Sequence, residues 1–404
     1  MEINQKKIKT KILPPYQPVA QARKKLNFRF VKDKIDRPFL IIVLVLLVFG
    51  FVMMFSASYA WGLYDADDGY YYIKRQLFSG VLGLIGMFLV SYLDYHFYQN
   101  TKIAFLLFAG ALALNFITAF VGDEVAGARR WITIAGMQFQ PSEILKVAVI
   151  IIFSYILAVN WQKFDNWRFS IVPFAVILGF CAVAVAAQRH MSGVLIFGII
   201  GLSMMFVGGV PKKYFWRFIG CLCIALAAFL IYKVFLDSDG GFSYITERFE
   251  SWQNPKSDPQ GSTYQTYQSL LAIGSGGIFG LGFGESRQKY LYLSESQNDF
   301  VFSIICEELG FVGACVVIIL FAIFILRGFY IASRSRDRFG MLLAAGITIQ
   351  IGSQALLNIA VATNAFPNTG ISLPFFSYGG TALLIQLLEM GVLLSVSRQA
   401  NKSP

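Results

Sequence analysis

The chain has 404 residues, of which 56% are hydrophobic and 14% are charged, and its formal net charge is +11. Soluble domains do not carry that much apolar surface, so this composition excludes a soluble enzyme. It predicts an all-α polytopic membrane protein, and we expect no nucleic acid among its partners.

Ten apolar stretches are long enough to cross a bilayer. They lie at 38–59, 74–93, 102–121, 142–160, 170–188, 191–208, 214–236, 300–327, 339–361 and 375–397. A tail rich in lysine and arginine over 1–37 precedes the first stretch, and basic residues near span ends stay on the cytoplasmic side. We therefore expect a cytoplasmic tail, one transmembrane domain over 38–397 and a cytoplasmic C-terminus over 398–404.

This topology places three long loops outside, over 122–141, 237–299 and 362–376. In the large extracellular loop, 237–299, aromatic and leucine residues recur at helical spacing over 264–271. That spacing predicts an amphipathic helix on the outer membrane surface.

The glycine-rich segment 274–284 follows this helix. It fits neither the dinucleotide fingerprint nor a phosphate-binding loop, so nucleotide binding is not supported. Gly276, Gly280 and Gly284 have the four-residue spacing of close helix packing, with direct substrate contact as the alternative. The five cysteines fall within predicted spans, and their spacing indicates neither a disulfide framework nor a metal site.

Two arginines, Arg129 and Arg130, precede Trp131 on the side of the membrane where cations are disfavoured. Guanidinium groups match phosphate oxygens bidentately, and Trp131 would suit an isoprenoid or the bilayer interface. The alternative is that the arginines form surface ion pairs with Asp123 and Glu124.

Asp299 directly precedes the apolar run that opens the span 300–327. Aspartate is favoured as a helix N-cap, and near the positive end of a helix dipole it stays ionised. An ionised carboxylate just outside the bilayer could also act as a general base toward a sugar hydroxyl. The capping role and the catalytic role are compatible.

Other acidic residues lie inside predicted spans, where a charged group needs a partner, water or substrate. Glu143 has Lys146 one turn away, and their charges compensate each other at the membrane edge. For Glu307 we expect a buried cation as partner, and the candidates are Arg130, Lys146 and Arg189.

The segment 364–381 carries two prolines and three glycines at the start of the last span. Irregular backbone at this depth is tolerated only where protein or water surrounds it. We therefore expect this segment to line a cavity.

Together these segments resemble the SEDS family of bacterial membrane proteins, over nearly all of the chain after the tail. The motifs that carry the resemblance are Gly127-Ala-Arg-Arg-Trp-Ile132, Gln140-Pro-Ser-Glu143, Asp258-Pro-Gln-Gly-Ser262, Asn298-Asp299-Phe-Val-Phe302, Glu307-Glu308-Leu-Gly310 and Pro367-Asn-Thr-Gly-Ile-Ser-Leu-Pro374 with Ser377-Tyr-Gly-Gly-Thr381. Ser286-Arg-Gln-Lys289 and the long basic tail resemble the FtsW and SpoVE branch more than RodA.

The resemblance implies a peptidoglycan glycosyltransferase that polymerises lipid II at the outer face of the bacterial cytoplasmic membrane. It implies Asp299 as the catalytic residue. The residues expected to bind substrate are Arg129, Arg130, Trp131, Glu143, Lys146, Glu307, Pro367, Thr369, Pro374, Ser377, Tyr378, Gly379 and Gly380. A class B penicillin-binding protein and other division proteins are the expected partners. No cofactor is certain, and a divalent cation, Mg²⁺ or Mn²⁺, assisting the diphosphate is left open.

Two positions depart from the family pattern. A Gln-Pro-Asp-Leu-Gly-Thr-like motif is here Gln188-Arg-His-Met-Ser-Gly193, so a role for an aspartate there is in doubt. The residue before Asp299 is Asn298, where threonine is common.

Three classes of function compete: a polymerising transferase for division or the spore cortex, a flippase of lipid-linked precursors, and a scaffold for other synthases. A RodA-like elongation polymerase is the alternative within the first class. A flippase needs polar groups across the membrane, and the sequence has no internal repeat to support a transporter. A scaffold has no need for a carboxylate among outer cations.

Overall fold

The computed structural model describes residues 30–400 except 32, 126–127, 135–136, 189–190, 237–248 and 262. The predictions for tail residues 1–29, for Arg189 and for loop residues 237–248 lie outside the described residues.

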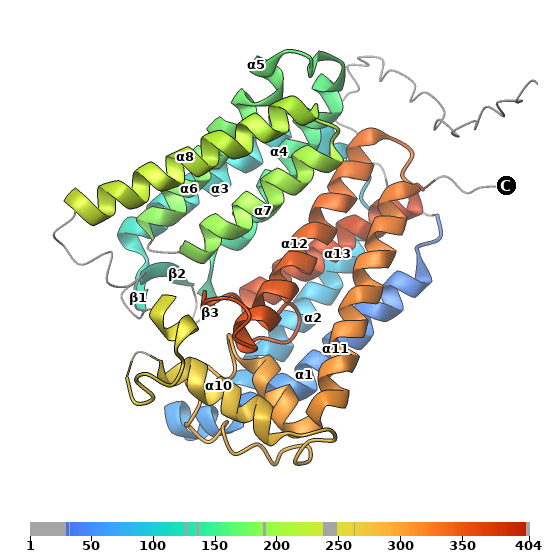
Figure 1. Cartoon of the computed structure of the whole chain (residues 1–404). Helices are drawn as coiled ribbons and strands as arrows, with labels where there is room; N and C mark the ends of the chain where they lie inside the picture. The colour runs from blue at the N-terminus through green and yellow to red at the C-terminus, as the bar shows by residue number, and fades with distance from the viewer. Residues whose placement is uncertain are drawn as a thin grey trace, which may run out of the picture.

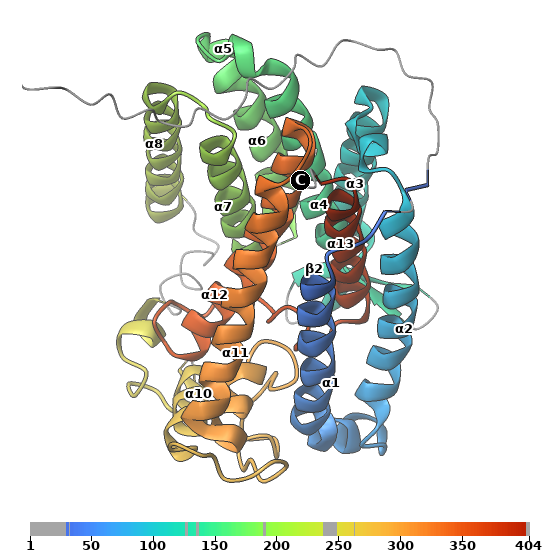
Figure 2. The same ribbon diagram turned by 90° about the vertical axis from the view of Figure 1, so that its right-hand side faces the viewer.

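The elements follow one another as α1 (Arg37–Ala66), α2 (Tyr71–Tyr92), η1 (Tyr95–Gln99), α3 (Thr101–Val121), β1 (Asp123–Val125), β2 (Ala128–Ile134), β3 (Met137–Phe139), α4 (Pro141–Asn160), η2 (Trp161–Lys163), α5 (Trp167–Ser170), α6 (Val172–Ala187), α7 (Met191–Val207), α8 (Lys212–Leu236), α10 (Tyr264–Ser275), α11 (Val301–Ser333), α12 (Arg338–Ala362) and α13 (Gly380–Arg398). The long helices form one bundle (Figure 1). We call the end that carries β1–β3 and α10 the loop face. The opposite end, which carries η1 and α5, is the tail face (Figures 1 and 2).

The structure is a multi-pass helical membrane protein, as the composition predicts. Among the described residues, eight helical segments are long and apolar enough to cross a bilayer. They are Arg37–Ala66, Tyr71–Tyr92, Thr101–Val121, Pro141–Lys163, Trp167–Ala187, Val301–Ser333, Arg338–Ala362 and Gly380–Arg398. The predicted spans 191–208 and 214–236 are also helices, α7 and α8, so the total of ten spans stays a prediction.

The bundle is centred on α4, α12 and α13, which bury most of their length, whereas α2 and α3 lie at its edge. Small residues let α2 and α13 approach closely. A Cβ at Gly391 would lie 2.6 Å from the carbonyl oxygen of Met87, and one at Gly83 would lie 2.6 Å from the Leu387 side chain. Larger residues at these positions would push the two helices apart.

An aspartate fixes the start of α1 at the tail face. The Asp36 side chain accepts a hydrogen bond from the Phe39 N–H (2.9 Å), so it caps the helix. The same carboxylate binds the Arg327 guanidinium of α11 through two nitrogens, at 2.9 and 2.7 Å. The Asp36 side chain therefore caps the start of α1 and joins this helix to α11.

A histidine at the tail face lies between two aspartates. His96 Nδ1 is 2.6 Å from Asp94 and Nε2 is 3.4 Å from Asp337, which also caps α12. Burial alone would lower the pKa of His96, but the hydrogen bonds and charges of Asp337 and Asp94 outweigh it and raise that pKa from 6.5 to about 9. At neutral pH the imidazole is therefore charged and joins η1 to the start of α12.

This pKa predicts how the stability of the protein depends on pH. A group whose pKa rises on folding stabilises fully below its unfolded pKa, and this contribution is lost as pH rises through the folded pKa. We expect wild type to melt at a higher temperature than His96→Gln at pH 6, and the difference to shrink between pH 6.5 and 9. Melting curves of both proteins in detergent across this range measure it. A difference that stays constant would contradict the assignment.

The loop before α4 forms a small antiparallel sheet in the order β1-β2-β3, which the sequence patterns did not predict. Thr133 of β2 links this strand to β1, because both its N–H and its hydroxyl donate to the Asp123 side chain of β1, at 2.9 and 2.6 Å. Successive side chains of a strand point to opposite faces of the sheet. Arg129 and Arg130 therefore leave β2 on different sides.

The predicted span over 300–327 forms α11, which is long and apolar enough to cross a bilayer, but one residue interrupts its helical path. Gly310 has φ 65° and ψ −163°, which breaks the helical path of α11 two residues after Glu308. The glycine-rich segment fills the break with four backbone hydrogen bonds. They run from Leu281 N to Glu307 O (2.9 Å), Gly282 N to Glu308 O (3.1 Å), Phe311 N to Gly277 O (2.9 Å) and Val312 N to Ile278 O (3.1 Å).

Close packing explains two of the three spaced glycines in this segment. A Cβ at Gly276 would lie 1.9 Å from the carbonyl oxygen of Cys306, and one at Gly280 would lie 2.1 Å from that of Glu308. Nothing lies within 4 Å of a Cβ at Gly284. The packing interpretation is confirmed for Gly276 and Gly280, and α10 confirms the helix predicted over 264–271.

Candidate active site

Asp299 lies at the loop face, in the turn that leads into α11. Its predicted role as helix N-cap is wrong, because the cap position is Phe300 and the helix begins at Val301. The Asp299 carboxylate lies over the irregular segment before α13. Its Oδ2 is 3.2 Å from the place a Cβ would occupy on Gly370, whose φ is +67°. A side chain at position 370 would crowd this carboxylate.

The segment 364–379 is held from several sides. Ser377 Oγ accepts a hydrogen bond from Leu373 N (2.7 Å) within the segment. Gln76 of α2 donates to the Ser377 carbonyl and accepts from Gly379 N, both at 3.1 Å. Tyr378 N donates to the carbonyl of Gln297 (2.8 Å), two residues before Asp299. Polar main-chain groups of this irregular segment therefore find hydrogen-bond partners within the protein.

Of the other residues predicted in this segment, Thr369 accepts a hydrogen bond at its carbonyl from the Ser192 hydroxyl of α7. Pro374 is buried, and Pro367, Tyr378 and Gly380 are partly exposed. The predicted cavity stays a prediction. Ser192 belongs to the motif that departs from the family pattern, so this motif contacts the candidate site through serine.

The sheet and the last helix meet beside this segment. Thr381 Oγ1 in the first turn of α13 donates to the Gln138 carbonyl of β3 (3.0 Å) and accepts from Gln140 N (3.3 Å). These two bonds join the arginine-bearing sheet to the segment that faces Asp299.

The two arginines have different surroundings. Arg129 is exposed and pairs with Glu124 at 3.3 Å, and it also donates to the Phe120 carbonyl, so the surface-pair alternative is confirmed for Arg129. Asp123 bonds to Thr133 instead of an arginine. Arg130 and Trp131 are partly buried. Of the two cations, Arg130 is thus the less exposed.

Glu143 and Lys146 form the predicted ion pair, with 2.8 Å between Nζ and Oε2 and both side chains almost completely buried. Glu389 of α13 adjoins this pair and faces Gln350 of α12. Glu389 was not predicted, although a carboxylate within the apolar stretch 375–397 was a signal. Three central helices therefore meet at one buried polar cluster.

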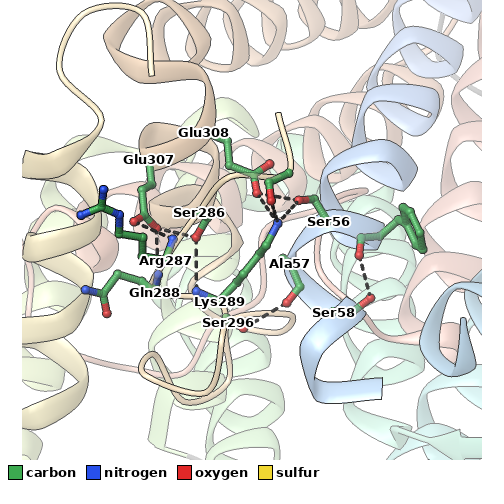
Figure 3. Close-up of polar contacts among 12 residues, drawn as sticks. Ser56, Ala57, Ser58, Ser286, Arg287, Gln288, Lys289, Ser296, Glu307 and Glu308 are labelled. Atoms are coloured by element: carbon green, nitrogen blue, oxygen red, sulfur yellow. Dashed lines mark hydrogen bonds and ion pairs between the residues drawn. The ribbon is translucent and has the colours of Figure 1, made fainter. Parts of the chain in front are cut away.

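The prediction of a cation as partner for Glu307 is wrong among the described residues. Glu307 is 1% exposed, and its carboxylate accepts hydrogen bonds from Ser286 Oγ (2.5 Å), Arg287 N (3.0 Å) and Gln288 N (3.3 Å), as Figure 3 shows. Neutral donors of a turn thus satisfy the charge. Glu307 holds the large loop on α11, and the structure does not group it with Asp299.

The neighbouring carboxylate has the buried cation instead. Glu308 Oε1 is 2.9 Å from Lys289 Nζ and 2.6 Å from the Ser56 hydroxyl of α1, and Lys289 also donates to Gly284 O (Figure 3). The exposed fractions of the two charged side chains are 0% and 4%. This ion pair joins α1, the large loop and the break in α11.

Asp299, the segment 364–379 and the sheet with Arg130 thus lie at one end of the bundle. A carboxylate and a cation at one end of a membrane-spanning helix bundle are the groups expected of an integral membrane enzyme that acts where membrane meets water. The chain belongs to the FtsW, RodA and SpoVE family of cell cycle proteins, whose model matches residues 37–402.

Curated relatives are similar to this protein over nearly the whole chain. It is 36% identical to the probable peptidoglycan glycosyltransferase FtsW of Geobacter sp. strain M18, over 90% of this chain and 96% of the relative. It is also 36% identical to the stage V sporulation protein E of Bacillus subtilis, over 91% and 98%.

Solved structures agree with the fold. A chain from a peptidoglycan synthase complex that coordinates polymerization and crosslinking is 25% identical, with a TM-score of 0.71 over 90% of this chain and 98% of that one. The rod shape determining protein RodA of Thermus thermophilus is 24% identical, with a TM-score of 0.65 over 91% and 98%.

Proposed function

We propose that this protein is a peptidoglycan glycosyltransferase that polymerises lipid II, an undecaprenyl-diphosphate-linked disaccharide-pentapeptide, into glycan strands. The observation that carries the proposal is the Asp299 carboxylate, which lies close to Gly370 at the loop face of a chain that matches named glycosyltransferases. The loop face is the outer side of the bacterial cytoplasmic membrane, and both termini are cytoplasmic. The basic tail before α1 supports this orientation.

In this proposal Asp299 acts as the general base. It takes the proton from the 4-hydroxyl of the acceptor GlcNAc while that oxygen attacks the anomeric carbon of the donor. The bond from this carbon to the diphosphate breaks, the diphosphate leaves with the electron pair, and the centre inverts. One positioned base typically contributes about 10²- to 10⁴-fold to such a step.

We assign the diphosphate to Arg130, because a guanidinium binds phosphate oxygens through two parallel hydrogen bonds. Arg130→Lys keeps the charge but replaces the planar fork with a point charge, so polymerisation should fall. Arg130→Ala should lose more polymerisation activity than Arg130→Lys. Arg129→Lys should lose less, because Arg129 pairs with Glu124 at the surface. Initial rates on lipid II measure the series. Full activity in Arg130→Ala would show that this arginine is a surface charge only.

A divalent cation would enter this site with the substrate. Among the described residues no group of three or more His, Cys, Asp or Glu side chains is placed to hold a metal. Mg²⁺ sites need only one or two carboxylates when phosphates supply the other ligands, and Asp299 could be such a ligand. Bound there, the cation would neutralise charge on the leaving diphosphate.

The relatives also support a proposal for the biological setting. Similarity at 36% to both an FtsW and a sporulation protein supports septal division or spore cortex synthesis, with elongation as the alternative. A partner is supported because a similar chain belongs to a peptidoglycan synthase complex. We propose a class B penicillin-binding protein in this role.

The test is the purified protein with lipid II, with and without the penicillin-binding protein, followed by electrophoresis of the glycan products. We expect chains that are longer or more abundant with the partner. Polymerisation measured after EDTA treatment, and again after Mg²⁺ or Mn²⁺ is added back, tests whether a divalent cation assists the reaction. Movement of lipid II between leaflets without glycan synthesis would favour a flippase instead.

A further inference from the structure

A buried asparagine lies beneath the candidate catalytic residue. Asn358 is on α12, one turn before the helix ends, and its side chain is 0% exposed. Its amide nitrogen donates to the main-chain carbonyl of Asp299 and to that of Ile371, each at 2.7 Å. An amide nitrogen carries two hydrogens, so both donors are used.

These two bonds join the two segments that form the site. Asp299 belongs to the turn before α11, and Ile371 follows Gly370, where an added Cβ would lie 3.2 Å from the Asp299 carboxylate. One amide therefore fixes the backbone on both sides of this close approach. Because Asn358 stands on one of the most buried helices, its own position is set by the core of the bundle.

A second amide bridge crosses the same two segments. Gln265 of α10 accepts from Asn368 (3.0 Å) and donates to Ser294 (2.9 Å), and Asn368 accepts from Gly370 N (3.2 Å). Asp299 is thus placed between a bridge from α12 and a bridge from α10. The α12 bridge bonds to Asp299 itself.

We propose that Asn358 is a positioning residue for the reaction, which holds the Asp299 carboxylate at the acceptor hydroxyl through the backbone of residues 299 and 371. This inference rests on the proposed function. A group that sets the place of a base affects the chemical step and leaves the affinity for substrate unchanged. A misplacement of about 1 Å can cost about 10²-fold in rate.

The experiment grades the number of donors at position 358. Serine offers one hydroxyl donor and alanine none, so kcat should fall in the order wild type, Asn358→Ser, Asn358→Ala. We expect a loss of about 10- to 100-fold in kcat for alanine, with KM for lipid II unchanged. Rates are normalised to folded protein, measured by size-exclusion chromatography and thermal melting.

Asn115→Ala provides the matched control, because Asn115 is also 0% exposed and its amide donates to a main-chain carbonyl, that of Ala111 (2.8 Å). This variant should lose stability and keep kcat. A wild-type kcat in Asn358→Ala, a change in KM alone, or loss of folded protein in both Asn358 variants would overturn the positioning role. If Asp299→Asn is inactive while Asn358→Ala is fully active, this inference fails and the proposed function stands. Activity in Asp299→Asn would remove the proposed function itself.

Discussion

Replacing Asp299 with asparagine should abolish glycan synthesis and leave the protein folded. The substitution removes the proton acceptor and keeps the size of the side chain, and loss of a general base typically costs about 10²- to 10⁴-fold. The N-cap position of α11 is Phe300, one residue after Asp299. The hydrogen bond from Asn358 ends on the Asp299 carbonyl, which the substitution does not alter. Product length and rate on lipid II, with melting temperature beside them, measure the effect.

A second carboxylate on the same turn serves as control. Glu295 is exposed and accepts a hydrogen bond from Asn298 (2.6 Å), so Glu295→Gln removes a nearby negative charge without touching the site. We expect this variant to polymerise at the wild-type rate. Wild-type rates in Asp299→Asn would refute the catalytic assignment, and equal losses in both variants would point to a general effect of charge at the loop face.

The sequence predicted the helices of the bundle well, because a span must be long and apolar wherever its neighbours lie. It predicted poorly what the backbone does between spans. The break at Gly310 depends on Gly277, Ile278, Leu281 and Gly282, which supply partners for the interrupted helix. Hydropathy does not record such pairings, so the stretch 300–327 reads as continuous.

The candidate site shows the same division. Asp299 could be identified from its place at a span end and from the family resemblance. Its neighbours could not, because Gly370 and Asn358 reach it only through the fold, and the Asn358 amide bonds to the main-chain carbonyl of Asp299. Glu307 was assigned a cation because a buried carboxylate needs a partner. Hydroxyl and amide donors meet the same need, and local sequence does not distinguish the two.

The largest effect on stability should come from breaking the buried ion pair between Lys289 and Glu308. Removing one partner leaves the other charge buried and uncompensated, which typically costs about 3–5 kcal/mol. We therefore expect Lys289→Met to lower the melting temperature sharply. The double variant Lys289→Met with Glu308→Gln should recover most of this loss, because neutral residues of similar size often replace a buried pair at little cost. Thermal unfolding of wild type, Lys289→Met, Glu308→Gln and the double variant in one detergent completes the double-mutant cycle.

An exposed ion pair provides the control that distinguishes the effect of burial from the effect of removing a charge. Lys74 and Asp68 lie 2.7 Å apart with exposed fractions of 67% and 35%, so Lys74→Met should change the melting temperature little. The Lys289 pair also joins α1 to the loop that fills the break in α11, through Ser56 and Gly284. Proteolysis should therefore cut the 277–292 segment of Lys289→Met faster than that of Lys74→Met. Equal melting temperatures for the two single variants would mean that the loop is held by its backbone bonds to α11 alone.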